Sequence, residues 1–151
     1  MVVSAQRGVT DAIMKVVSEL LHKNDEQDIS ELLADLSTRH LTALKGAAPS
    51  HYDEIRTIIE RRIENLGNLL RAIYYLKELT PRSYDYVSSF GERLNVPIIY
   101  ACLCEIGVPS TFLDACKAGI LTTRSHGDAV AFPAGDQRIR DHLLPRITGI
   151  K

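Results

Sequence analysis

Two short runs of residues combine hydroxyl, glycine and acidic side chains in patterns that suit ligand binding. The first run contains Ser4, Gly8 and Thr10 at the expected entrance to a helix. Small residues at a helix entrance leave backbone N–H groups pointing outward, where they can bind a carboxylate or phosphate with help from the helix dipole. A plain turn with Thr10 as the N-cap is the commoner arrangement, and both interpretations stay open.

The second run covers residues 88–95 and contains Gly91 and Glu92. A glycine at this place would let a ligand or a neighbouring backbone approach closely. The Glu92 carboxylate beside it could receive the ammonium group of a substrate. An exposed glutamate paired with Arg93 or another base is the more common situation for such a residue, and it remains the alternative.

The remaining candidates for chemistry are weaker. Three cysteines occur at positions 102, 104 and 116, and the five histidines show no metal-ligand spacing. Cys102 and Cys104 would lie on different faces of a helix, so we expect small core residues rather than a metal site or a nucleophile. Asp114 ends a strand candidate and could hold a partner there, although acidic residues at strand ends usually cap turns.

Length and composition limit the class of protein. The chain has 151 residues, 45% hydrophobic and 25% charged, with a formal net charge of −1. These values predict a single globular domain and give no electrostatic case for binding nucleic acid or an anionic membrane. We see no signal peptide and no apolar run long enough to span a bilayer, so we expect a cytoplasmic protein.

Apolar residues at helical spacing predict three helices in the first half of the chain. They run from Thr10 or Asp11 to about residue 21, from about residue 29 to 46, and from about residue 52 to 78. The second and third helices are expected to form an antiparallel hairpin over residues 28–79.

The second half changes character. Residues 82–106 still favour helix, with interruptions at Gly91 and Pro97, an Asn95 cap and a stop at Gly107. Beyond this point the pattern indicates three short strands, at residues 110–114, 120–123 and 129–132. It also indicates a turn at residues 125–128 and a further helix at residues 137–144. Together these elements predict an α/β fold, a layered sandwich with a mainly parallel sheet. Val2 and Val3 resemble the end of a core strand and residues 146–150 the start of another, so residues 1–151 are expected to be part of a larger domain.

Four segments in a fixed order resemble aspartokinases, of the amino-acid kinase superfamily. Residues 3–11 resemble that family's second strand and following helix, and residues 89–94, Ser-Phe-Gly-Glu-Arg-Leu, resemble its Gly-Glu-Arg-Leu-Ser helix. Residues 112–122 resemble the strand pair beyond it, and residues 147–150 resemble the strand before its Gly-Phe-Ile-Gly turn. Each motif alone is moderately specific, and the shared order makes the resemblance strong.

The resemblance implies a middle slice of the catalytic domain of an aspartate kinase. That family transfers the γ-phosphoryl group of ATP, with Mg²⁺, to the side-chain carboxylate of L-aspartate, the first step toward lysine, threonine and methionine. The resemblance implies that Ser4 and Thr10 contact bound aspartate and that Glu92 recognises its ammonium group. Three glycines are further candidates for binding aspartate: Gly8, Gly91 and Gly149. No residue of the chain is assigned a catalytic role. The family's phosphate-binding glycine loops have no counterpart here, so we expect the segment alone to bind neither ATP nor Mg²⁺ and to be inactive.

Two alternatives remain. The chain could belong to another amino-acid kinase, of the glutamate or uridylate kinase type. It could also be a non-catalytic helical interaction module built on the hairpin of residues 28–79, which an exposed apolar stripe on that hairpin would favour. Because strand edges without neighbours tend to pair with other chains, we also expect a homo-oligomer.

Overall fold

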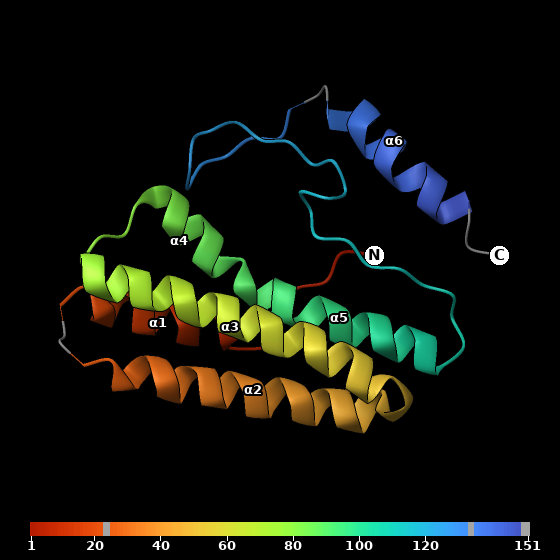
Figure 1. The fold of residues 1–151 in the computed structure, drawn as a ribbon. Coiled ribbons are helices and arrows are strands. Elements are labelled where there is room, and N and C mark those ends of the chain that lie inside the picture. The colour runs from red at the N-terminus through yellow and green to blue at the C-terminus, as the bar shows by residue number, and fades with distance from the viewer. Residues whose placement is uncertain (23–24, 133–134, 149–151) are drawn as a thin grey trace.

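A computed structural model describes residues 1–22, 25–132 and 135–148, and within them the chain forms helices and loops but no β-strand. Figure 1 shows α1, α2, α3 and α5 packed as a bundle, with α4 at an angle to them and α6 beyond a long loop. The helices, including the short 3-10 helix η1, are α1 Val9–Leu20, α2 Gln27–Ala47, η1 Pro49–His51, α3 Tyr52–Leu76, α4 Pro81–Ser88, α5 Phe90–Glu105 and α6 Gly135–Thr148.

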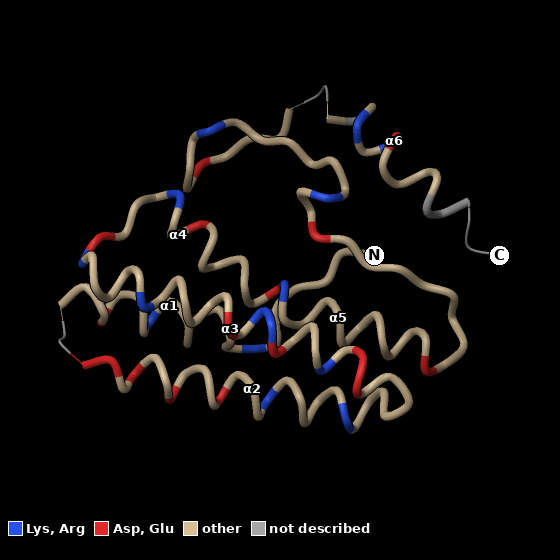
Figure 2. The backbone as a smooth tube through the Cα atoms, viewed as in Figure 1, with Lys and Arg blue, Asp and Glu red and all other residues tan. Residues whose placement is uncertain are grey.

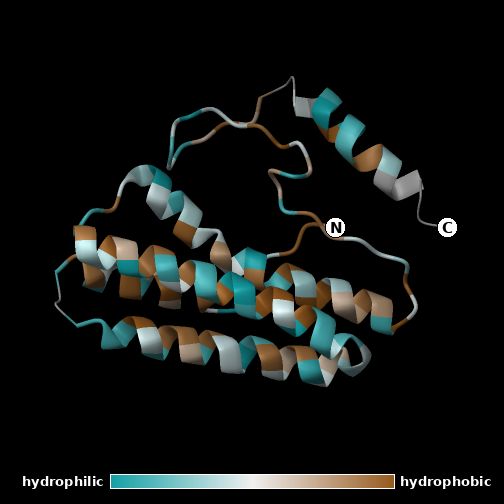
Figure 3. Ribbon diagram, viewed as in Figure 1, coloured by the Kyte–Doolittle hydropathy of each residue, from teal (hydrophilic) through white to brown (hydrophobic). Residues whose placement is uncertain are grey.

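The three N-terminal helices form where the apolar spacing predicts them. α2 and α3 lie side by side and are joined through Ala48 and η1, so the expected helical hairpin is present with helix bounds of 27–47 and 52–76. Its apolar stripes are buried against α1 and α5, and Figure 3 shows hydrophobic and hydrophilic faces along both helices. The core side chains of α3 include Ile55, Ile59, Ile63, Leu66 and Leu70.

Charges follow the dipole of α2. Acidic residues occupy the N-terminal half of this helix and basic residues the C-terminal half, as Figure 2 shows. This arrangement places carboxylates near the positive end of the helix dipole and cations near the negative end, which stabilises the helix.

Among the described residues, no helix is long and apolar enough to cross a membrane.

The region predicted as one interrupted helix, residues 82–106, is two helices divided at Ser89. Thr80 caps α4 by accepting a hydrogen bond from the Ser83 backbone N–H at 3.1 Å. α5 ends in a Schellman motif, in which the N–H groups of Gly107 and Val108 donate to the carbonyls of Cys104 and Leu103. Gly107 has a φ of 78°, which favours glycine, so the predicted stop at this residue is confirmed.

α5 runs through Pro97 without a break, so the predicted fresh start at Asn95 is wrong. Proline has no N–H, and the carbonyl of the residue four positions earlier, Arg93, therefore lacks its helical partner. The Arg62 guanidinium of α3 donates to that carbonyl instead. The helix can continue because a side chain from a neighbouring helix satisfies the freed acceptor.

The predicted α/β sandwich with a mainly parallel sheet is wrong, because the described residues contain no sheet. Of the three strand candidates after α5, residues 120–123 and 129–132 share a single antiparallel bridge, Thr122 with Ala131, and residues 110–114 form none. Val2 is 99% exposed in an extended N-terminal segment. The N–H and C=O groups of a strand need hydrogen-bond partners on a neighbouring strand. Helices fill the core of this chain, so the strand candidates have no such neighbour there. Residues 146–148 belong to α6 rather than to a strand, and residues 149–151 lie outside the described part of the chain.

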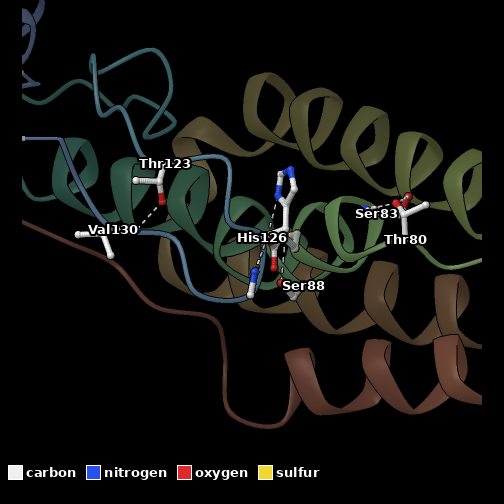
Figure 4. A network of polar contacts seen from close by, with 8 residues as sticks. Thr80, Ser83, Ser88, Thr123, His126 and Val130 are labelled. Atoms are coloured by element: carbon white, nitrogen blue, oxygen red, sulfur yellow. Dashed lines mark hydrogen bonds and ion pairs between the residues drawn. The ribbon is translucent and has the colours of Figure 1, made fainter.

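The loop between α5 and α6 is attached to α4. The Asp85 carboxylate accepts hydrogen bonds from the His126 ring at 3.0 Å and from the Gly127 N–H at 3.1 Å. Figure 4 shows His126 beside Ser88 of α4, with Thr123 and Val130 paired farther along the loop. The predicted turn is present, because Asp128 N–H donates to the Ser125 carbonyl at 3.1 Å.

Candidate functional site

The N-terminus of α1 lies against the first turn of α5. A side chain built on Gly91 would place its Cβ only 2.4 Å from Thr10 Oγ1 and 2.9 Å from the Ala5 Cβ. Real Cβ atoms do not approach other atoms so closely, so the two helices can meet here only because residue 91 is glycine. The space beside Gly91 is therefore filled by Thr10 and Ala5 of the chain itself, and not left open for a ligand.

A second contact brings Ser4 to the same place. Asn95 Nδ2 donates to the Ser4 carbonyl at 2.8 Å, which fixes the N-terminal segment across the start of α5 (Figure 1). Glu92 precedes Asn95 by three residues and so lies one turn earlier on the same side of the helix. The contacts of Gly91 and Asn95 thus bring the N-terminal segment with Ser4 and Thr10 to the first turns of α5, which carry Glu92.

The three candidate side chains, Ser4, Thr10 and Glu92, are partly or fully exposed. Within the described residues, the Ser4 and Thr10 hydroxyls and the Glu92 carboxylate have no hydrogen-bond or ion-pair partner. Glu92 is half-buried and its carboxylate is not paired with Arg93, whose guanidinium lies over the Phe90 ring at 4.4 Å. Arg93 is thus not the partner of Glu92 among the described residues, and a role for Glu92 in ligand binding stays a prediction.

The arrangement combines one anionic side chain, Glu92 in the first turn of α5, with the N-terminal end of α1. Helix N-termini carry unpaired N–H groups and a partial positive charge, which attract carboxylates. A carboxylate facing them can hold an ammonium group of the same molecule. The cluster therefore has the chemistry to bind a small molecule that carries both charges.

The other candidate positions differ in their surroundings. Gly8 is the N-cap residue of α1 with a φ of 77°, so Thr10 is in the first turn and is not the predicted cap. Gly8 is exposed, and a Cβ built there would meet nothing within 4 Å. Gly149 lies outside the described residues.

Sequence reasoning missed the part played by Arg62 and gave Asp114 no certain partner. Arg62 Nη2 lies 3.1 Å from Asp114 Oδ1, and the two side chains are only 12% and 19% exposed. Burial lowers the pKa of the Arg62 guanidinium from its ordinary value, while the charge of Asp114 acts in the opposite direction. Pro97 was the available signal, because a proline within a helix leaves an unpaired carbonyl four residues earlier.

The comparisons with known proteins point to one class of enzyme. No protein-family model matches the chain. It is 33% identical over 102 residues to aspartokinase 2, chloroplastic, of Arabidopsis thaliana, covering 62% of this chain and 19% of that protein. Aspartokinase 1, chloroplastic, of the same plant is 38% identical over 102 residues, which is 62% of this chain and 18% of the relative. The aspartate kinase of Pseudomonas putida is 32% identical over 81 residues, 51% and 20% of the two chains.

These relatives are named as aspartokinases or aspartate kinase, and the chain is similar to a part of each. The chain is a relative of the aspartokinases, and the resemblance expected from its motifs is confirmed. It spans about a fifth of the length of each of these three relatives, as a segment of such an enzyme would. Several relatives are named as chloroplastic, and the cytoplasmic location of this chain stays a prediction.

Proposed function

We propose that the chain is the aspartate-binding part of an aspartate kinase. In the complete enzyme, the γ-phosphoryl group of ATP is transferred to the side-chain carboxylate of L-aspartate. The observation that carries this proposal is the gathering of Ser4, Thr10 and Glu92 at the start of α1 and α5, in a relative of the aspartokinases.

The roles follow from the charges of L-aspartate. Its ammonium group binds the Glu92 carboxylate, and a carboxylate binds at the N-terminus of α1 with the hydroxyls of Ser4 and Thr10. Charge-assisted hydrogen bonds of this kind are shorter and stronger than neutral ones, so they supply most of the affinity. The acceptor carboxylate is already ionised at neutral pH, so phosphoryl transfer requires positioning and charge stabilisation rather than a general base.

The interaction-module alternative receives little support. It predicts an exposed apolar stripe on the hairpin of α2 and α3, yet the side chains of that stripe are buried in the core among the described residues. The names of the relatives likewise favour aspartokinase over a glutamate or uridylate kinase.

ATP and Mg²⁺ belong to the complete enzyme in this proposal. We expect the 151-residue chain alone to give no Mg²⁺-dependent ADP release above background with aspartate and ATP in a coupled assay. Turnover above background would contradict this expectation. The exposed apolar side chains of the loop before α6, among them Ile120, Val130 and Phe132, are consistent with a homo-oligomer, which we retain as a proposal.

The proposal is tested by comparing ligands that differ in one charged group. Isothermal titration of the chain with L-aspartate, succinate and L-asparagine separates the ammonium group from the side-chain carboxylate. A charged hydrogen bond is worth about 1.5–3 kcal/mol, so succinate, which lacks the ammonium group, should bind roughly tenfold or more weakly than L-aspartate. Equal affinities for L-aspartate and succinate would remove Glu92 from ligand recognition.

A further inference from the structure

A second candidate site lies where α3 meets α5, and it includes Arg93, the residue that follows Glu92. A cavity of about 410 Å³ opens between α3, the first turns of α5 and the loop that follows α5. Its volume falls in the range of pockets that hold small molecules. Nothing in the proposed aspartate-binding role uses this cavity.

Its wall is strongly cationic. Four basic side chains line it, together with a single carboxylate, Asp114, and the four are Arg61, Arg62, Arg93 and Lys117. The carboxylate is already paired with Arg62 at 3.1 Å. Arg61 and Lys117 are exposed, and within the described residues their side chains make no hydrogen bond or ion pair. The cavity therefore carries positive charge that the chain itself does not neutralise.

A buried donor in the same wall also lacks an acceptor. Arg93 Nη1 is buried and has no hydrogen-bond partner among the described residues. Buried polar atoms in folded proteins are almost always hydrogen-bonded. The Arg93 guanidinium packs over the rings of Phe90 and Tyr86, at 4.4 and 5.1 Å from their centroids, so Arg61 and Lys117 are the cations open to a ligand.

The cavity also has an apolar wall. Phe112 and Leu113 line it beside Ile58 of α3, and the Phe112 ring is held by Tyr100 at a centroid distance of 5.1 Å. The Arg62 guanidinium lies 5.7 Å from the centroid of the same ring. A ligand that fills this cavity thus meets both cationic side chains and an aromatic ring.

We propose that this cavity binds a small organic anion, with its phosphate or carboxylate group against Arg61 and Lys117 and its apolar body against Phe112. Guanidinium groups suit both kinds of anion because their planar fork donates two parallel hydrogen bonds. The proposal stands independently of the aspartate-binding role of Glu92.

Simple aromatic anions serve as probes of this site. Isothermal titration of the chain with phenyl phosphate, benzoate, inorganic phosphate and phenol tests the charge and the ring separately. Phenyl phosphate and benzoate should bind, and the tighter of the two shows which anionic group the cavity prefers. Equal affinity for inorganic phosphate and phenyl phosphate would contradict the proposed binding of the ligand's apolar body by Phe112. Equal affinity for phenol and phenyl phosphate would contradict the proposed binding of its anionic group by the basic side chains.

Matched variants locate the binding. Arg61→Gln and Lys117→Gln should each weaken the tighter probe by about three- to tenfold, as expected when one charged hydrogen bond is lost. Arg82→Gln and Lys45→Gln remove the same charges at exposed positions outside the cavity and should leave the affinity unchanged. Circular dichroism checks that every variant remains helical. An equal loss in the control variants would assign the binding to overall charge and contradict the proposal.

Discussion

Gly91 sets the distance between α1 and α5, and with it the position of the Thr10 hydroxyl. The space that a side chain at residue 91 would occupy already contains Thr10 Oγ1 and the Ala5 Cβ. Closely packed interiors tolerate an added methyl group poorly, because neighbouring atoms must shift. Gly91 is therefore a structural requirement of the candidate site, while Glu92 beside it is free to act on a ligand.

Gly91→Ala should destabilise the chain, because the new methyl group lies within 2.4 Å of Thr10 Oγ1. We expect a loss of about 1–3 kcal/mol in the free energy of unfolding, measured by urea denaturation. Thr10→Ala removes the nearest atom, so the double variant should lose less than the sum of the two single losses. Additive losses would show that Gly91 and Thr10 do not share this contact.

At the scale of elements, α5 is tied to α3 through a defect in its own hydrogen bonding. Pro97 frees the Arg93 carbonyl, that carbonyl fixes Arg62, and Arg62 holds Asp114 of the following loop. One proline thereby connects two helices and a loop. The same linkage forms one wall of the cationic cavity.

Arg62→Met should cost about 2–4 kcal/mol of stability, since it leaves the Asp114 carboxylate and the Arg93 carbonyl without their donor. In a Pro97→Ala background, the N–H of residue 97 can pair with that carbonyl. The cost of Arg62→Met should then fall by about 1 kcal/mol, the usual worth of one hydrogen bond. A double-mutant cycle by urea denaturation measures this coupling, and a coupling of zero would contradict the linkage through Pro97.

The elements that could be predicted from the sequence are those with local signals. The apolar stripes of α1, α2 and α3 and the glycine that ends α5 could be predicted from residues close together in the sequence. The continuation of α5 through Pro97 could not be predicted this way, because the compensating donor, Arg62, comes from another helix. The strand candidates failed for a related reason: β-pairing depends on distant partners, and a run such as residues 129–132 cannot reveal whether one exists.

The candidate site shows the same division. Ser4, Thr10 and Glu92 were chosen from residue type and family resemblance, without any evidence of proximity. Their gathering depends on the Gly91–Thr10 approach and on the Asn95–Ser4 hydrogen bond, which join residues distant in sequence.

At the scale of the whole molecule, the helical core formed by the described residues contains a buried ionisable side chain. His40 of α2 is 0% exposed, its Nδ1 donates to the Leu36 carbonyl at 2.7 Å, and its Nε2 has no partner among the described residues. Burial lowers the pKa of His40 below its ordinary value of 6.5, since the charged ring would lose its hydration. The folded chain therefore keeps this ring neutral under conditions in which the unfolded chain protonates it.

The stability of the fold should fall as the pH decreases below 6.5, because the unfolded state then binds a proton that the folded state does not. The decrease should stop once the pH passes below the lowered pKa of the folded protein. His40→Leu should reduce this pH dependence, whereas His22→Gln, at an exposed position, should preserve it. Urea denaturation at a series of pH values measures the slope, and equal slopes for the wild-type and His40→Leu chains would contradict the role of His40.

The recognition of an ammonium group by Glu92 is the central claim, and the affinity of the Glu92→Gln variant for L-aspartate tests it most directly. Isothermal titration should show a dissociation constant about ten- to a hundredfold higher than that of the wild-type chain, because the amide keeps the shape of the side chain and loses its charge. Glu78→Gln, which neutralises an exposed glutamate after α3, is the matched control and should leave the constant unchanged. Circular dichroism confirms that both variants are folded. An unchanged dissociation constant for Glu92→Gln would contradict the account.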